Sequence, residues 1–119
     1  SVNIGSGVKS IGYYTFSDCK SLTSIVIPDS VTTIGDWAFG SCSGLKSVTI
    51  GSGVTDIGIR AFTNCSSLSS ITCYATTAPD IGSRIFDSLL TNGTLHVPQG
   101  SDYSSWLSIL GSGWTIEYL

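Results

Sequence analysis

Residues 34–57 read I-G-D-W-A-F-G-S-C-S-G-L-K-S-V-T-I-G-S-G-V-T-D-I, and their residue types recur at a spacing of 23 residues. The recurring columns are Val8, Val31 and Val54; Ile11, Ile34 and Ile57; Gly12, Gly35 and Gly58; Phe16, Phe39 and Phe62; Cys19, Cys42 and Cys65; and Leu22, Leu45 and Leu68. A fixed period of this length is typical of a solenoid, in which each repeat buries its apolar side only by stacking on its neighbours. The repeat therefore predicts the architecture. It says much less about function, because the repeated residues are those of a core.

The period divides the chain into coils. We expect one domain made of a partial first coil (1–7), three regular coils (8–30, 31–53 and 54–77), a divergent last coil (78–98) with a shift of 24 residues, and a C-terminal cap (99–119). In the last coil Leu89 takes the cysteine column, a departure that is common in end repeats. Because Val2 and Ile4 already occupy the columns of Ile25 and Ile27, we expect a fragment of a longer protein. Its exposed first strand would allow self-association.

Each coil contains one short strand. In L-T-S-I-V-I (22–27), apolar and other residues alternate, so Ile25 and Ile27 point inward while Ser24 and Val26 point outward. Stacked coils place such strands side by side, roughly 4.8 Å apart, as a parallel sheet. The predicted fold is a solenoid of right-handed coils with this sheet on one face and turns or short helical or extended segments on the other, with Phe39 and its equivalents in the centre.

The Gly-Ser-Gly triplets at 5–7, 51–53 and 111–113 mark turns. They lack the lysine and the helix start of a phosphate-binding loop. We expect their glycines to adopt positive φ at the turn that follows each strand.

After Pro98 the repeat stops, and a helix followed by a strand is predicted. The helix would be capped by Ser101 and ended by Gly111, with Tyr103, Trp106, Leu107 and Leu110 on its apolar side; Trp114, Ile116 and Tyr118 would alternate along the strand. This segment has the two-sided character needed to cover the end of a solenoid.

Charge and hydropathy exclude two classes of partner. Eight acidic and five basic residues are scattered singly, with a net charge of −3, so no basic stripe exists for a nucleic acid. No run of about 18 apolar residues is present, which excludes membrane insertion of this chain. An N-terminal export signal is not found within it, so any such signal would lie outside these residues.

The residues whose types suit catalysis or metal binding do not converge on one site. Cys19, Cys42 and Cys65 share an inward column at a spacing that a disulfide could bridge, but their apolar neighbours favour buried thiols. A linear ladder does not offer tetrahedral metal coordination. His96 aligns with outward residues and Cys73 with inward ones, so they cannot form a nucleophile and base pair. We expect an exposed, solvated His96, no enzyme activity, and no metal or other cofactor.

Two outward surfaces are candidates for binding. On the sheet, the columns are Ser24, Ser47, Ser70 and Thr94, and Val26, Thr49, Thr72 and His96. They would form a flat, hydrogen-bonding surface, although Ser and Thr also suit any solvated β-surface. On the opposite side, Tyr14, Trp37 and Arg60 form one column, continued by Arg84, with Tyr13 beside it. These residue types are enriched at binding hot spots, and they also stack on one another for purely structural reasons.

The columns I-x-I-P-x-x-V-x-x-I-G-x-x-A-F-x-x-C-x-x-L over 25–45 resemble the BspA-like leucine-rich repeat family of bacterial surface proteins. The ending L-H-V-P-Q-G-S-D-Y-S-S-W…G-W-T-I (95–116) is similar to the closing segment of such proteins. The resemblance implies a leucine-rich repeat solenoid within an exported adhesin, extracellular or on the cell surface. It would contact a protein or carbohydrate on a host or neighbouring cell. The alternative is a spacer or display scaffold in a longer surface or phage-borne fibre protein.

Overall fold

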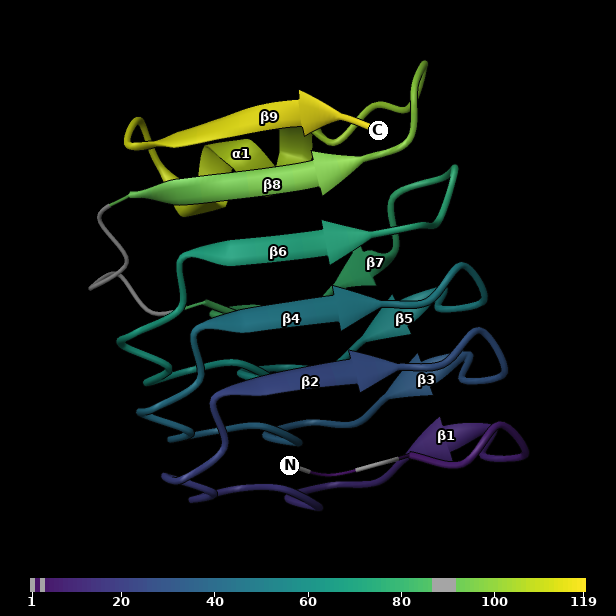
Figure 1. Cartoon of the computed structure of the whole chain (residues 1–119), viewed down its shortest axis with the longest axis vertical. Helices are drawn as coiled ribbons and strands as arrows, with labels where there is room; N and C mark the ends of the chain where they lie inside the picture. Colours follow the sequence, from purple (N-terminus) through teal and green to yellow (C-terminus); the bar gives the residue numbers. More distant parts are fainter. Residues whose placement is uncertain (1, 3, 87–91) are drawn as a thin grey trace.

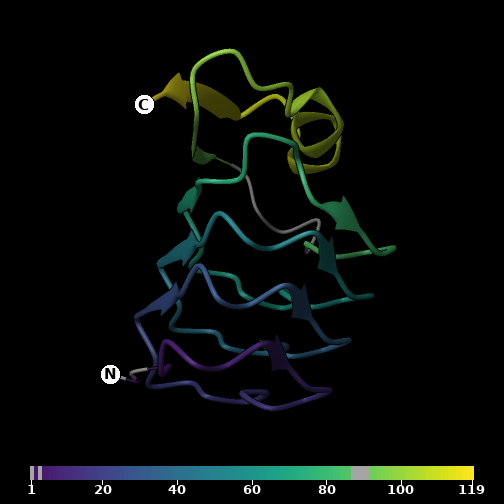
Figure 2. The same ribbon diagram turned by 90° about the vertical axis from the view of Figure 1, so that its right-hand side faces the viewer.

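The structure, a computed structural model, describes residues 2, 4–86 and 92–119 of the chain. The chain winds as a solenoid whose coils stack along one axis (Figure 1). One sheet contains β2 (Ser24–Ile27), β4 (Ser47–Ile50), β6 (Ser70–Cys73), β8 (Gly93–Val97) and β9 (Trp114–Tyr118); the other contains β1 (Ser10–Ile11), β3 (Thr33–Ile34), β5 (Asp56–Ile57) and β7 (Asp80–Ile81). All neighbouring strands are parallel, and the two sheets occupy separate sides of the coil (Figure 2). The predicted parallel solenoid is confirmed.

The strand register follows the sequence repeat. Ser24 pairs with Ser47 and Ser47 with Ser70, each 23 residues apart, whereas Asp56 pairs with Asp80 at the expected shift of 24. The position of Leu89 in the cysteine column lies outside the described residues.

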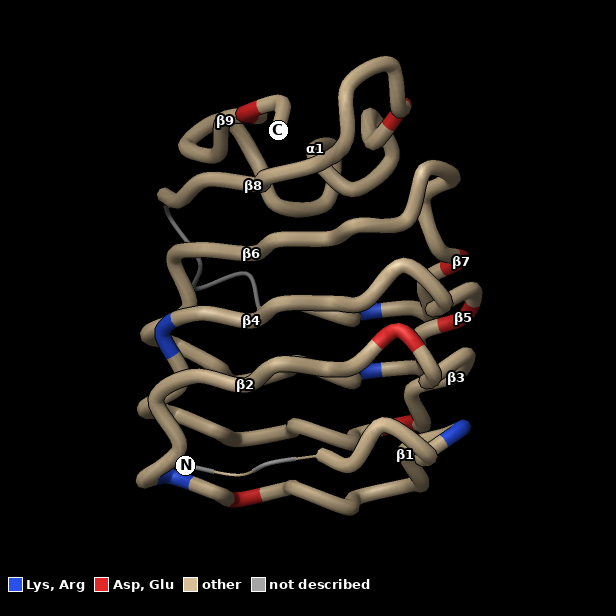
Figure 3. The backbone as a smooth tube through the Cα atoms, turned by 45° about the vertical axis from the view of Figure 1, so that its right-hand side comes forward, with Lys and Arg blue, Asp and Glu red and all other residues tan. Residues whose placement is uncertain are grey.

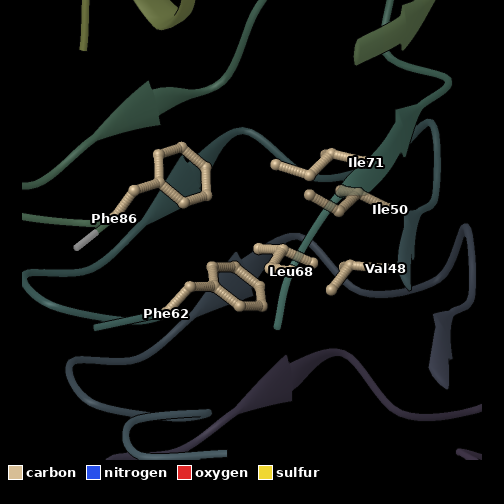
Figure 4. A pocket seen from close by; sticks show the side chains of 6 residues that line it. All are labelled: Val48, Ile50, Phe62, Leu68, Ile71 and Phe86. Atoms are coloured by element: carbon tan, nitrogen blue, oxygen red, sulfur yellow. The ribbon is translucent and has the colours of Figure 1, made fainter. Parts of the chain in front are cut away.

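A continuous stack of phenylalanines runs through the middle of the coils. The ring centroids of Phe16, Phe39 and Phe62 follow one another at 5.2 Å, and Phe86 continues the stack at 6.0 Å. Two of these rings pack against the sheet with almost no space between the side chains, about 0 Å³ (Figure 4). The side chains at this contact are Val48, Ile50, Phe62, Leu68, Ile71 and Phe86. The core is therefore closely packed, and it offers no internal cavity here for a ligand.

The side that carries the aromatic residues is built from hydrogen-bonded turns. The Trp37 N–H donates to the Ile59 carbonyl at 3.0 Å and the Phe39 N–H to the Ala61 carbonyl at 2.8 Å, so the backbone of this side is satisfied between coils. Two columns of these turns have left-handed backbone. One consists of Tyr14 (φ 58°), Trp37 (φ 60°), Arg60 (φ 56°) and Arg84 (φ 54°), and the other of Asp18, Ser41 and Asn64. Neither this conformation nor the second, four-stranded sheet was part of the prediction.

The prediction of positive φ in the Gly-Ser-Gly turns is wrong for the triplets at 5–7 and 51–53; within the third triplet Gly111, which follows α1 rather than a strand, has a φ of 99°. Gly51 does not lie in the left-handed region. A Cβ at Gly51 would instead lie 2.6 Å from the carbonyl carbon of Pro28 in the preceding coil. Glycine is needed there because two backbones approach closely, not because of φ.

The predicted helix and strand are both present after the last coil. Helix α1 (Ser104–Leu110) buries Trp106 and Leu110 and ends at Gly111, as expected. Ser101 does not cap it: its hydroxyl donates to the Pro98 carbonyl at 2.6 Å, while the Asp102 carboxylate accepts from the Ser104 N–H at 3.0 Å. The capping prediction was wrong because the backbone turn at 98–101 occupies the serine.

Strand β9 both caps the solenoid and extends its larger sheet. β9 pairs in parallel with β8, from Gly93–Trp114 to Val97–Tyr118, and so adds a fifth strand to the sheet, with α1 behind it (Figure 1). Trp114 is buried as predicted, but Tyr118 is 50% exposed. Within the described ranges, no helix has the length and apolarity to cross a membrane.

Candidate binding surfaces

The predicted outward residues of the five-stranded sheet lie in two straight rows. Ser24, Ser47, Ser70 and Thr94 are register partners in succession, as are Val26, Thr49, Thr72 and His96. We call these eight side chains the sheet face. Strand β9 extends the rows with Thr115 and Glu117, which the sequence repeat did not indicate.

The sheet face is accessible and almost uncharged. Val26 is 62% exposed and Ser24 is exposed, while the rows toward β8 are half-buried against one another. No described element packs over this side of the sheet (Figure 1). Charged residues are scattered singly along the chain rather than gathered into a patch (Figure 3). The arrangement offers hydroxyl groups at a regular spacing, together with one exposed aliphatic side chain.

His96 is not the fully solvated residue that we expect from the sequence. Its side chain is 25% exposed, and its Nδ1 lies 3.8 Å from Oε1 of Glu117. The reason is the parallel pairing of β9, which places Glu117 directly beside His96. Its predicted orientation is correct, since the adjoining row position is Thr72 and Cys73 is buried on the inner side.

The second candidate surface is the aromatic edge, which we define as Tyr13, Tyr14, Trp37 and Arg60. The rings of Tyr14 and Trp37 stack with centroids 5.9 Å apart and an interplanar angle of 16°. The Arg60 guanidinium carbon lies 5.4 Å from the centroid of the Trp37 ring. These are the offset aromatic and cation–π contacts that the structural interpretation predicts.

Part of the aromatic edge is nevertheless open to solvent. Tyr13 is 72% exposed and Tyr14 is also exposed, whereas Trp37 and Arg60 are half-buried by their own stack. Both faces of the Trp37 ring are thus occupied from within the chain, and Tyr13 and the outer side of Tyr14 remain for a partner. For this reason the sheet face is the better candidate.

The cysteines form the inward ladder that the repeat predicts. All four lie in described ranges and are thiols; Cys42, Cys65 and Cys73 are buried and Cys19 is half-buried at the first coil. The Cys42 and Cys65 thiols donate to the carbonyls of Phe16 and Phe39, at 3.1 and 3.2 Å. Burial raises the pKa of the Cys73 thiol, which makes it a poor nucleophile. The described part of the chain has no group of three or more His, Cys, Asp or Glu that could hold a metal ion.

A hollow that the sequence did not indicate opens beside the sheet face, at the carboxyl ends of β2 and β4. It has a volume of about 470 Å³, and its lining includes Val26, Asp29, Ser30, Thr49 and Tyr74. Asp29 and Tyr74 belong to no repeated column, so the period gave them no weight. The available signal was a column at the usual spacing that holds Pro28, Gly51 and Tyr74 in turn.

The first coil presents a second kind of surface. Strand β2 is the outermost strand of its sheet, Phe16 is only half-buried, and two shallow hollows of about 380 and 360 Å³ lie at this end, both lined in part by Val2. An open strand edge favours pairing with another chain. Self-association through this end stays a prediction.

The geometry agrees with one known repeat architecture. The family described as "BspA type Leucine rich repeat region (6 copies)" matches residues 1–103. The chain belongs to this family. No curated protein and no solved structure matches the chain. In this BspA-type leucine-rich repeat domain, the recurring apolar columns, such as those of Ile34 and Phe39, are buried, and the sheet face lies on the outside.

Proposed function

We propose that this domain is a non-enzymatic binding module of a surface-exposed or secreted adhesin, and that it contacts a protein or glycan on a host or neighbouring cell through the sheet face. The observation that supports it most is the pair of in-register rows across β2, β4, β6 and β8, uncovered by any described element. Solenoids offer such extended surfaces for binding.

The chemistry of the rows suits a contact made by hydrogen bonds and shape rather than by charge. Of these eight positions only His96 is ionisable. Hydroxyls of Ser and Thr donate and accept hydrogen bonds, and their small size leaves a flat surface on which a partner can lie. Glu117 and His96 give one end of the face a polarity that Val26 at the other end lacks.

The test compares two double variants that each introduce two lysines. Thr49→Lys with Thr72→Lys alters the sheet face. Thr32→Lys with Thr55→Lys alters exposed threonines beside the other sheet, in a column where Lys9 is already present. Attachment of the purified domain to an extracellular-matrix coat, to immobilised glycans and to cultured cells is measured for both. We expect attachment to fall at least about tenfold for the first double variant only.

Equal attachment of both double variants would overturn the role of the sheet face. If the parent protein also attached equally well with the whole repeat array deleted, the domain would be a spacer or display scaffold. In either case thermal unfolding shows whether the variants are folded.

A further inference from the structure

The hollow beside the sheet face is lined by residues of successive coils. Ile27, Ile50 and Cys73 are register partners, so the residues that follow them, Pro28, Gly51 and Tyr74, succeed one another along the stack. All three of these following residues line the hollow. Its volume of about 470 Å³ lies within the range of small-molecule sites, roughly 300 to 1,000 Å³.

One wall of the hollow is an exposed aromatic ring. Tyr74 is 48% exposed, although its backbone is held in place by its N–H, which donates to the Ile50 carbonyl at 3.0 Å. A half-exposed ring on a fixed backbone presents an apolar face at little cost in conformational entropy. The C–H face of a sugar ring is a natural partner for such a surface.

The lining also includes an oriented carboxylate. Oδ1 of Asp29 accepts a hydrogen bond of 2.8 Å from the Ser52 N–H, so the neighbouring coil orients the side chain. Oδ2 of Asp29 has no hydrogen bond within the described part of the chain. A carboxylate accepts hydrogen bonds only, and it accepts them strongly from hydroxyl donors.

Hydroxyl groups complete the lining. The Ser30 hydroxyl donates to the Val8 carbonyl at 2.7 Å, so toward a ligand its oxygen can act as an acceptor. Thr49 contributes a second hydroxyl from the sheet face. Together with Asp29 they offer several acceptors, which fits a ligand that carries several hydroxyl donors around an apolar ring.

We propose that this hollow binds a neutral saccharide unit, stacked on Tyr74 and hydrogen-bonded to Asp29. The inference rests on the proposed binding function and gives it a ligand class. No Lys or Arg lines the hollow, so an anionic sugar would meet the Asp29 carboxylate without compensation. A single carboxylate is also too few oxygen ligands for Ca²⁺, which takes six to eight.

The test measures binding of a panel of neutral methyl glycosides (glucose, galactose, mannose and N-acetylglucosamine) and of anionic N-acetylneuraminic acid by saturation-transfer NMR and calorimetry. At least one neutral sugar is expected to bind the whole domain. Tyr74→Ala and Asp29→Asn should each weaken it at least about tenfold. The matched controls are Tyr118→Ala, which removes a tyrosine of similar exposure, and Asp56→Asn, which removes an exposed carboxylate outside the hollow. Both should leave the affinity unchanged.

Three results would overturn the proposal: no binding of any neutral sugar, equal losses in Tyr74→Ala and Tyr118→Ala, or tighter binding of the anionic sugar. The failure of the proposed function looks different. Thr72→Lys alters the sheet face but does not line the hollow. If Thr72→Lys abolishes attachment to matrix or cells while no sugar binds, the sheet face keeps its function and the saccharide site is excluded. A peptide ligand would be indicated by attachment that Tyr74→Ala reduces and free sugars do not compete.

Discussion

The hydroxyl of Tyr103 donates a hydrogen bond of 2.6 Å to the carbonyl oxygen of Ala75, which ties the C-terminal cap to the third coil inside the core. Tyr103→Phe removes this donor and leaves the buried carbonyl unsatisfied. We expect a loss of about 1 to 3 kcal/mol in the free energy of unfolding, measured with urea at neutral pH. Tyr13→Phe, at a tyrosine that is 72% exposed, serves as the control and should be neutral.

The same residue predicts a dependence on alkaline pH. Burial raises the pKa of the Tyr103 hydroxyl well above its ordinary value of 10.0. The unfolded chain therefore releases this proton at lower pH than the folded chain. The contribution of Tyr103 to the free energy of unfolding is complete below pH 10 and falls as the pH rises further. Burial also raises the Cys73 pKa above 9.0, in the same direction. Urea unfolding from pH 8 to 11 should show a steeper decline in the wild type than in Tyr103→Phe, and parallel curves would contradict this assignment.

The phenylalanine stack predicts unequal costs for one substitution. Phe39 is fully buried between two rings, whereas Phe16 at the first coil is half-buried. Phe39→Ala should cost about 3 to 5 kcal/mol of unfolding free energy, and Phe16→Ala distinctly less. Chemical denaturation of the two variants checks this, and equal costs would mean that the first coil is as well covered as the second.

Two glycines of one column should respond differently to alanine. A Cβ at Gly51 would meet the Pro28 backbone at 2.6 Å, whereas a Cβ at Gly5 has no atom within 4 Å. Gly51→Ala is therefore expected to lose about 1 to 3 kcal/mol by overpacking, and Gly5→Ala to be neutral. Comparable melting temperatures for the two variants would show that the coils move apart at no cost.

Substitutions of Trp37 test how much strain its left-handed backbone conformation carries. Asn tolerates positive φ, so Trp37→Asn relieves about 1 to 2 kcal/mol of strain while it loses stacking of similar size. Because the relieved strain and the lost stacking nearly cancel, the free energy of unfolding of Trp37→Asn should stay within about 1 kcal/mol of the wild-type value. Trp37→Val, which loses the stack and puts a β-branched residue in this conformation, should be clearly destabilised. A loss of attachment in folded Trp37→Asn would move the binding site to the aromatic edge.

The sequence period predicts the features that repeat, and it does so for a physical reason. Residues such as Ile25 and Phe39 are inward because stacking has to bury them, and Thr49 and Thr72 then follow as outward partners in register. The pairing of β9 could not be predicted this way, because residues 99–119 lie outside the period. The contact of His96 with Glu117 depends on that pairing and was missed with it.

Two further features could not be predicted from the sequence: the left-handed backbone of the turns and the hollow beside the sheet face. Side-chain type at Tyr14 or Arg60 argues against positive φ, which the inter-coil hydrogen bonds impose. The hollow is lined by Pro28, Gly51 and Tyr74 from successive coils, so it appears only once the coils are stacked. Such a column of dissimilar residues gives no periodic signal.

Phe39 meets an identical ring on either side, Phe16 and Phe62, each at a centroid distance of 5.2 Å. A tandem duplication of the segment 31–53 would consequently place the new copies of Ile34, Phe39, Cys42 and Leu45 beside neighbours of the kind that these residues already have. The cap would simply be carried outward by one strand spacing, roughly 4.8 Å. Unequal exchange between its own repeats thus gives the gene a way to change the reach of the protein in equal steps, without a compensating mutation in the interior.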